Sequence, residues 1–386
     1  TIQSSGKGNG IQVSKQVRNI LISSQIAVAT VLIFINIILY KDASQLIEQP
    51  LGYQTKDIIS AVLALPSAEQ DLRSQQLTEL KQALLNHPKI AGVSQSMRPT
   101  GFRTLALTVE TTNRRFSMAA KDVDHQYFSL IEQPIIEGDN FTEADIKDDN
   151  LVMVINDVLA KQIAVNGSAI GVTFKNGVRV IGVVKSINRP GRKLVEPRFY
   201  YPSRLTRNML LIKAKTGQTF SKEEMLLTLK TVDKKLNLFS FYQIEELKNQ
   251  YLFASKTTAI TTVILTLLTL FLSGLGLYGI LNYSSQMRRF EIGTRMAIGA
   301  KGKDIVRMIF RDNAGALLIG IMISILVLLG LYLGFSESLT SFISLELLPL
   351  LIITLALISL LCFLACYLPL RQYINKPTIH SLRGVE

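Results

Sequence analysis

The chain has 386 residues, of which 48% are hydrophobic, and it carries 42 Lys and Arg against 29 Asp and Glu, a formal net charge of +13. These basic residues are not concentrated on one soluble stretch, which argues against a nucleic-acid-binding protein, so no nucleic-acid partner is predicted. With only two cysteines in the sequence, a fold held together by several disulfides is excluded as well.

Four long, nearly uncharged apolar runs indicate membrane-spanning helices. Each is long enough to cross roughly 30 Å of hydrocarbon at about 1.5 Å per residue. Buried helices of a soluble core, the alternative, are usually shorter and amphipathic. We therefore predict transmembrane helices at 20–40, 257–282, 314–335 and 347–370. Gln25 and Asn36 in the first run should face another helix, because unpaired polar side chains are costly in lipid.

The distribution of Lys and Arg orients these spans. Basic residues collect in the linker and entry helix 1–19, in 283–312 and in the tail 371–386, whereas the loop 336–346 has acidic residues and no basic one. Cytoplasmic loops are enriched in Lys and Arg, so both termini and 283–312 are predicted to be cytosolic. The chain is then a multi-pass membrane protein, and 41–256 and 336–346 are predicted to face outside the cytosol.

The segment 41–256 mixes helical and strand patterns, so we predict an α+β domain inserted between the first two spans. Leu72–Leu85 has apolar residues at helical spacing. Ser221 and Glu224 form a capping box for a helix that runs to about 235. Strands are predicted at 104–110, 151–155, 178–184 and 209–214, an Asn156-capped helix at 157–163, and a helix at 244–255 that continues into the second span.

No catalytic or metal-binding set is recognisable in the sequence. His87 and His125 are isolated, and Cys362 and Cys366 lie one turn apart inside the fourth span, where packing is the expected role. The sequence has no Walker-type glycine loop, so we expect no directly bound cofactor and no enzymatic activity of the chain itself. A solvated loop is favoured over an anion site for the basic cluster Arg189, Arg192, Lys193 and Arg198.

Small residues in two of the spans predict close packing of helices. Glycines spaced three or four residues apart let helix backbones approach each other in lipid, which favours a packed bundle or dimer over isolated anchors. The candidate packing residues are Gly274, Gly276 and Gly279 in the second span and Gly330 and Gly334 in the third.

The stretch 283–312 is short, basic and interrupted by glycines, with apolar residues every few positions. We expect short helical pieces here, and Asp304 as a cap of the helix that enters the third span. Composition leaves two roles open: docking to a soluble cytosolic partner, or lying as a basic amphipathic helix on anionic headgroups.

A resemblance to a known family favours the first role. The runs 276–281 and 289–300, the second of which reads RFEIGTRMAIGA, resemble the signature of the FtsX-like, MacB-type ABC transporter permeases. The closing segment 367–383 and several stretches between 127 and 184 are also similar to that family. The resemblance implies a four-span permease of the cell inner membrane with 41–256 as its periplasmic domain, either a full subunit or the C-terminal half of an eight-span permease.

The function implied by the resemblance is that of a permease in an ABC exporter of the mechanotransmission class. A separate ABC ATPase would bind ATP-Mg and drive periplasmic movement that exports or extracts an antimicrobial peptide, a macrolide or a lipoprotein. Further implied partners are a second permease half or copy, the lipid membrane, and a periplasmic adaptor or substrate protein. The positions implied to contact the ATPase are Glu291, Ile292, Gly293, Arg295, Met296 and Gly299.

An alternative of another class is a membrane receptor or scaffold. Its outer domain would bind a ligand or a cell-wall hydrolase and signal across the membrane, and no ATPase would associate with it. The segment 283–312 distinguishes the two hypotheses, because only the permease needs it as a docking element.

Overall fold

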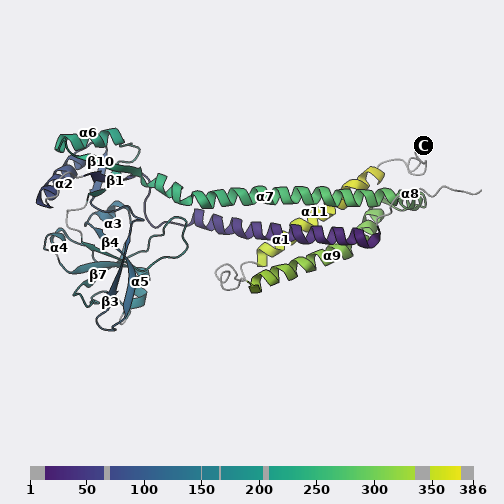
Figure 1. Ribbon diagram of the computed structural model, residues 1–386, viewed down its shortest axis with the longest axis horizontal. Coiled ribbons are helices and arrows are strands. Elements are labelled where there is room, and N and C mark those ends of the chain that lie inside the picture. The colour runs from purple at the N-terminus through teal and green to yellow at the C-terminus, as the bar shows by residue number, and fades with distance from the viewer. Residues whose placement is uncertain are drawn as a thin grey trace, which may run out of the picture. The chain divides into compact units, whose positions relative to one another are not determined.

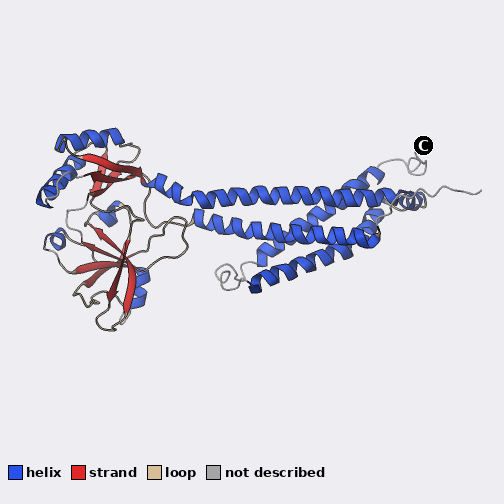
Figure 2. Ribbon diagram, in the orientation of Figure 1, coloured by secondary structure: helices blue, strands red, loops and turns tan. Residues whose placement is uncertain are grey.

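The computed structural model describes residues 14–64, 70–148, 150–164, 167–202, 208–334 and 348–374. The chain divides into two compact units, which we call the membrane unit (Thr1–Ser44 with Thr257–Glu386) and the outer unit (Gln45–Lys256). Long helices make up the membrane unit, and strands with shorter helices make up the outer unit (Figures 1 and 2). The predicted fold class, four apolar helices with an α+β domain between the first two, is confirmed.

The long helices are α1 (Lys15–Glu48), α7 (Ile244–Met287), α9 (Gly302–Gly334) and α11 (Leu348–Ile374). In the part of the chain that the structure describes, these four are long and apolar enough to cross a membrane. The predicted continuation of the helix at 244–255 into the second span is confirmed, because α7 is unbroken. Its 44 residues correspond to roughly 66 Å, about twice the thickness of a bilayer's hydrocarbon core.

An apolar cluster with α1 at its centre holds the membrane unit together. In the most apolar window of α1, 44% of the residues are buried, against 17–22% in the other three helices, so α1 shares the most surface with its neighbours. The cluster contains Ile22, Ile26 and Ile33 of α1, Leu277 and Leu281 of α7, Ala316 of α9, and Ile358, Cys362 and Cys366 of α11. The two cysteines are therefore packing residues, as expected.

Polar side chains of α1 also face the neighbouring helices. Gln25 Nε2 donates to the carbonyl oxygen of Ser273 in α7 at 3.1 Å, and Ser23 Oγ donates to the carbonyl oxygen of Ala316 in α9 at 2.8 Å. Asn36 is buried as well. Such bonds remove the cost of exposing these groups to lipid, so the prediction that Gln25 and Asn36 face inward is confirmed.

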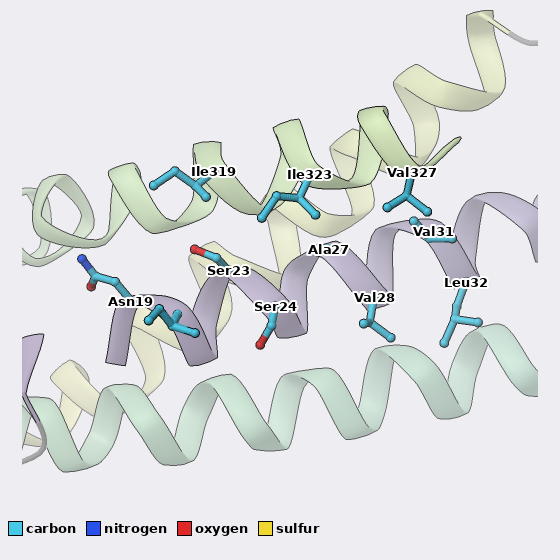
Figure 3. Close-up of a pocket in the computed structure, with 11 residues that line it drawn as sticks. Asn19, Ser23, Ser24, Ala27, Val28, Val31, Leu32, Ile319, Ile323 and Val327 are labelled. Atoms are coloured by element: carbon cyan, nitrogen blue, oxygen red, sulfur yellow. The ribbon is translucent and has the colours of Figure 1, made fainter. Parts of the chain in front are cut away.

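The helices α1 and α9 approach each other closely at Gly320. A Cβ atom built there would lie 2.8 Å from the carbonyl oxygen of Ser23 and 3.0 Å from the Ile26 side chain. Beside this contact, α1 and α9 border an apolar groove of about 500 Å³, with Ile319 and Ile323 on one side and Ser23 and Ala27 on the other (Figure 3).

The outer unit contains two sheets, of which the smaller is antiparallel. Its strand order is β10 (Asn237–Gln243), β1 (Ile58–Ala64), β9 (Met209–Ala214) and β2 (Ile90–Ser94). The helices α2 (Gln70–Leu85) and α6 (Lys222–Val232) pack on one face of this sheet. The capping box at Ser221 opens α6 as predicted, but α6 ends at Val232, three residues before the predicted end.

Alternating side chains make β1 a strand with two buried faces. Ile59, Ala61 and Leu63 pack with α2 and α6, whereas Ile58 points to the opposite face. On that face it joins residues of the larger sheet and Ile244 and Leu247, in the first turn of α7. The first turn of α7 is thus part of the hydrophobic core of the outer unit.

The larger sheet is mixed, and it has six strands among the described residues. Its order is β3 (Arg103–Thr108), β4 (Arg115–Val123), β8 (Arg198–Pro202), β6 (Val152–Asn156), β7 (Arg179–Val184) and β5 (Ile135–Gly138). The pairs β4–β8 and β6–β7 are parallel, and the others are antiparallel. The accompanying helices are α3 (Tyr127–Leu130), α4 (Glu143–Lys147) and α5 (Asp157–Ile163). Asn156 caps α5, as predicted, by accepting from the Leu159 amide.

Two details of the outer unit differ from the sequence prediction. Alternation of Leu105, Leu107 and Val109 predicts a half-buried strand, but Leu105 is 39% exposed, because β3 is an edge strand that pairs only with β4. The basic cluster at 189–198 was predicted to be a solvated loop, but Arg198 is fully buried in β8. There its Nη1 donates to the carbonyl oxygen of Ile187, and its guanidinium lies 4.6 Å from the centre of the Phe102 ring.

A second buried cation, Lys121, shares this aromatic surface. Its Nζ donates to the carbonyl oxygens of Arg98 and Pro99 and lies 4.2 Å from the centre of the Phe102 ring. Burial, together with nearby Arg198, lowers the pKa of Lys121 well below its ordinary value. The carbonyl oxygens and the ring compensate part of the cost of burying the charge.

We predict that Gly320→Ala destabilises the membrane unit. The added methyl group meets backbone of α1, so α1 and α9 must separate, at a cost of about 1–3 kcal/mol. Gly330→Ala in the same helix is the matched control, because a Cβ atom there has nothing within 4 Å and alanine raises helix propensity. Thermal unfolding in detergent should show a lower midpoint for Gly320→Ala alone; equal midpoints for both variants would contradict the close contact.

Candidate functional site

The segment between α7 and α9 forms a short helix, α8 (Arg289–Ala297), that packs on the start of α9. Ile292 is 2% exposed and lies in an apolar cluster with Ile305 and Ile309, and Met296 packs against this cluster. Residues 292 and 296 lie one turn apart, as do 305 and 309, so one stripe of each helix meets the other. The helix α8 is therefore attached to α9 through an apolar core of its own.

The opposite face of α8 is exposed. Arg295 Nη2 donates to Glu291 Oε1 at 2.9 Å, and these side chains are 52% and 44% exposed. Ile298, the residue that ends α8, is 83% exposed. The spacing 291, 295 and 298 places an ion pair and a bare apolar side chain on one helical face, a combination suited to docking a protein.

Backbone geometry fixes the end of α8. Gly299 has φ +102°, its amide donates to the Met296 carbonyl, and the Ala300 amide donates to the Arg295 carbonyl. These two bonds form a Schellman motif, which needs a residue with positive φ at this position. Gly299 thus ends α8 immediately after Ile298, so that the chain can turn into α9.

Two further contacts stabilise the segments that flank α8. Arg288, between α7 and α8, forms an ion pair with Asp312 of α9 at 2.5 Å. Asp304, expected to cap the helix that enters the third span, is the third residue of α9 and accepts from the Lys301 amide. However, α9 begins at Gly302, well inside the predicted cytosolic segment 283–312. The Arg288–Asp312 pair thereby joins the junction of α7 and α8 to α9.

The structure divides the six residues implied to contact an ATPase into two groups. Glu291, Arg295 and Gly299 are exposed and Met296 is half-buried, whereas Ile292 and Gly293 are buried. In this chain Ile292 contributes to packing, so a direct contact of Ile292 or Gly293 with a partner stays a prediction. Ile298 is exposed on the same face as Glu291 and Arg295 but was not among the predicted contact residues. Residue type alone does not distinguish Ile298 from the buried Ile292. The helical spacing of Ile298 from Glu291 and Arg295 could have identified it.

Of the five glycines predicted to pack between helices, two lie at helix contacts in the structure and three do not. A Cβ atom at Gly274 would lie 3.3 Å from Leu361 of α11, and one at Gly276 would overlap Gln25 of α1, so both lie at helix contacts. At Gly279, Gly330 and Gly334 a Cβ atom would have nothing within 4 Å in the described structure. These three have no close helix neighbour in a single chain, and their packing against a second chain stays a prediction. Gly320, a further glycine of the third span, lies at the close contact with α1.

The described residues contain no cluster of candidate metal ligands. His, Cys, Asp and Glu form no group of three or more that is able to hold a metal ion there. His87 lies edge-on to the Phe220 ring at 5.0 Å, a packing contact. The surface of α8 is therefore the best candidate for a functional site.

Two family models match successive parts of the chain. The model of the MacB-like periplasmic core domain matches residues 21–227, and that of the FtsX-like permease C-terminal region matches residues 263–378. A macrolide export ATP-binding/permease protein MacB 1/2 of Paracoccus denitrificans is 28% identical over 70% of this chain and 42% of its own length. The corresponding MacB of Pasteurella multocida is 24% identical over 69% of this chain and 43% of its own length.

This chain therefore spans about two fifths of the length of the curated relatives that it matches. Among solved structures, the periplasmic region of MacB from Actinobacillus actinomycetemcomitans aligns with 53% of this chain and 97% of its own length. The TM-score of that alignment is 0.39, and the sequence identity is 18%.

We predict that Gly299→Ala frays the end of α8. An alanine at φ +102° is strained by about 1 kcal/mol, so the Schellman bonds to Arg295 and Met296 should open more often. Hydrogen–deuterium exchange of a peptide covering 289–300 should be faster than in the wild type. Gly302→Ala is the control, because residue 302 is the first of α9, where alanine is well tolerated. Unchanged exchange in Gly299→Ala would show that the glycine is not required.

Proposed function

This chain belongs to the family of FtsX-like permeases that carry a MacB-like periplasmic core domain, and on that premise we propose that it is the membrane part of an ATP-driven exporter. In this proposal a separate ABC ATPase binds ATP-Mg and docks on the exposed face of α8, whereas this chain binds no nucleotide. The protein lies in the inner membrane with its outer unit in the periplasm and its termini in the cytosol.

The observation that carries the proposal is the way α8 is held. Its outer face presents Glu291, Arg295 and Ile298, while its inner face is fixed to α9 through Ile292. The Arg288–Asp312 pair joins the end of α7 to the same helix. A partner that moves α8 therefore moves the ends of two membrane-spanning helices together.

The helix α7 supports a mechanical role for this movement. It runs unbroken from Met287 back to Ile244, whose side chain belongs to the hydrophobic core of the outer unit. Because a helix resists compression and stretching along its axis, we propose that ATP-driven displacement of α8 reaches the periplasmic domain through α7. The transported substance is then moved by the outer unit and needs no pore through these helices.

Substrate and assembly are proposed from the relatives. These are named as macrolide export proteins, which makes a macrolide one candidate substrate, beside an antimicrobial peptide and a lipoprotein. We propose a second permease half or copy as the partner in the membrane, with Gly330 and Gly334 of α9 on surfaces that a single chain leaves open. A periplasmic adaptor or substrate protein is a further proposed partner of the outer unit.

The docking proposal predicts the effect of charge reversals on α8. Affinity-tagged chain purified from its own host's membranes should co-purify an ABC ATPase, and the eluate should hydrolyse ATP. Glu291→Lys and Arg295→Glu should each lower the recovered ATPase activity at least tenfold, and Ile298→Ser should lower it as well. Lys161→Glu, an exposed reversal on α5, is the control and should change nothing.

A double reversal separates docking from helix stability. Glu291→Lys combined with Arg295→Glu restores an ion pair within α8 but keeps the outer charges reversed. If α8 docks a partner, the double variant should recover as little ATPase activity as the single variants. Recovery of wild-type ATPase activity would show that only the ion pair within α8 matters. If no ABC ATPase co-purifies with the wild type or with any variant while the outer unit still binds a ligand, the exporter proposal is refuted. That result would favour a receptor.

A further inference from the structure

A pocket of about 650 Å³ lies between the first turns of α1 and the last turns of α7. Both helix ends belong to the membrane unit. The lining includes three basic side chains, Lys15, Arg18 and Arg288, together with the hydroxyl of Ser284. Leu21, Ile280 and Met287 supply its apolar part. This volume lies in the range of sites that enclose small molecules, which span roughly 300–1,000 Å³.

The central group of the pocket is Arg18, which is only 9% exposed. Its Nη1 donates to Ser284 Oγ at 2.8 Å and its Nη2 to Asn19 Oδ1 at 3.5 Å, whereas its Nε is buried without a hydrogen-bond partner in the described structure. Buried polar groups are nearly always paired, so a buried guanidinium with a free donor indicates a missing acceptor. Because arginine binds phosphate oxygens through two parallel N–H groups, a phosphate would supply such an acceptor.

The charge of the pocket is not balanced by the carboxylates near it. Arg288 is paired with Asp312, but Asp312 does not line the pocket. For Lys15, the described residues supply no ion pair, and Arg18 likewise forms none. The pocket thus presents a net positive charge to whatever occupies it, which favours an anionic ligand.

The position of the pocket in the membrane unit indicates which kind of anion would bind there. It lies at the ends of two helices that are apolar enough to cross a membrane, and its apolar residues continue along both helices. A ligand with an anionic head and apolar chains matches both parts, and basic pockets between transmembrane helices bind anionic lipid headgroups. Free phosphate would meet the basic residues but would leave the apolar part unfilled.

We propose that this pocket binds an anionic membrane phospholipid, whose phosphate is held by Arg18, Lys15 and Arg288 and whose acyl chains lie along α1 and α7. Arg288 also anchors the end of α7 to α9 through Asp312, one residue before α8. A bound phosphate therefore competes with Asp312 for Arg288. Lipid occupancy changes how tightly the ends of α7 and α9 are joined, whichever partner α8 docks.

The test is lipid titration of the full chain by native mass spectrometry in detergent. Wild type should bind phosphatidylglycerol more tightly than phosphatidylcholine. Lys15→Gln and Arg18→Gln should each weaken phosphatidylglycerol binding about fivefold, the factor expected for one basic residue at an anionic lipid. Arg311→Gln, an exposed arginine of α9 outside the pocket, is the matched control and should bind as wild type does.

Three results would overturn the proposal. The first is equal phosphatidylglycerol affinity for Lys15→Gln and Arg311→Gln; Lys15 is exposed, so this variant should fold even if Arg18→Gln does not. The second is full displacement of the lipid by equimolar glycerophosphoglycerol or inorganic phosphate, which would indicate a free-anion site. The third is a disulfide-linked dimer of Gly279→Cys that forms in membranes regardless of added phosphatidylglycerol, which would show that a second copy covers the pocket.

Discussion

The continuity of α7 is the constraint on which the rest of the structure depends. In lipid, backbone amides and carbonyls must be satisfied within the segment, so a spanning helix cannot be interrupted inside the bilayer. This helix also continues beyond the length that a bilayer requires, from Met287 to Ile244, where its first turn joins the hydrophobic core of the outer unit. Its other end is also fixed, because Arg288, the residue that follows α7, forms an ion pair with Asp312 of α9.

Much of the architecture is readable from the sequence, because a few local rules decide it. The four spans follow from length and low charge, α6 and α5 from the caps Ser221 and Asn156, and the buried strands β6 and β9 from continuous apolar runs. The pairing of strands is not readable in this way. The strands β1, β2, β4, β5, β8 and β10 were not predicted. Lys121 lies within β4 and Arg198 begins β8, and these charged side chains are buried through distant groups such as Phe102.

The candidate site shows the same limit at smaller scale. A run of alternating small, basic and apolar residues predicts a helix at 289–297 but not which side faces inward. That choice depends on Ile305 and Ile309 of α9, which begins at Gly302, earlier than the hydrophobic run suggests. Once α9 is in place, Ile292 and Ile298 take opposite roles. The close contact at Gly320 likewise depends on Ser23 and Ile26, some 300 positions away in the sequence.

The order of strands in the smaller sheet has a consequence for loads on the outer unit. The chain enters this sheet through β1, soon after α1, and leaves it through β10, directly before α7. These strands are antiparallel neighbours, and Ile59 lies opposite Gln243. Sliding one attachment against the other along the strand direction would load the whole β1–β10 ladder in shear, with its hydrogen bonds resisting together. Spreading the attachments sideways would instead unzip the ladder from the Ile59–Gln243 end, one bond after another. The domain is thus stiff toward a piston-like stroke and weak toward lateral opening.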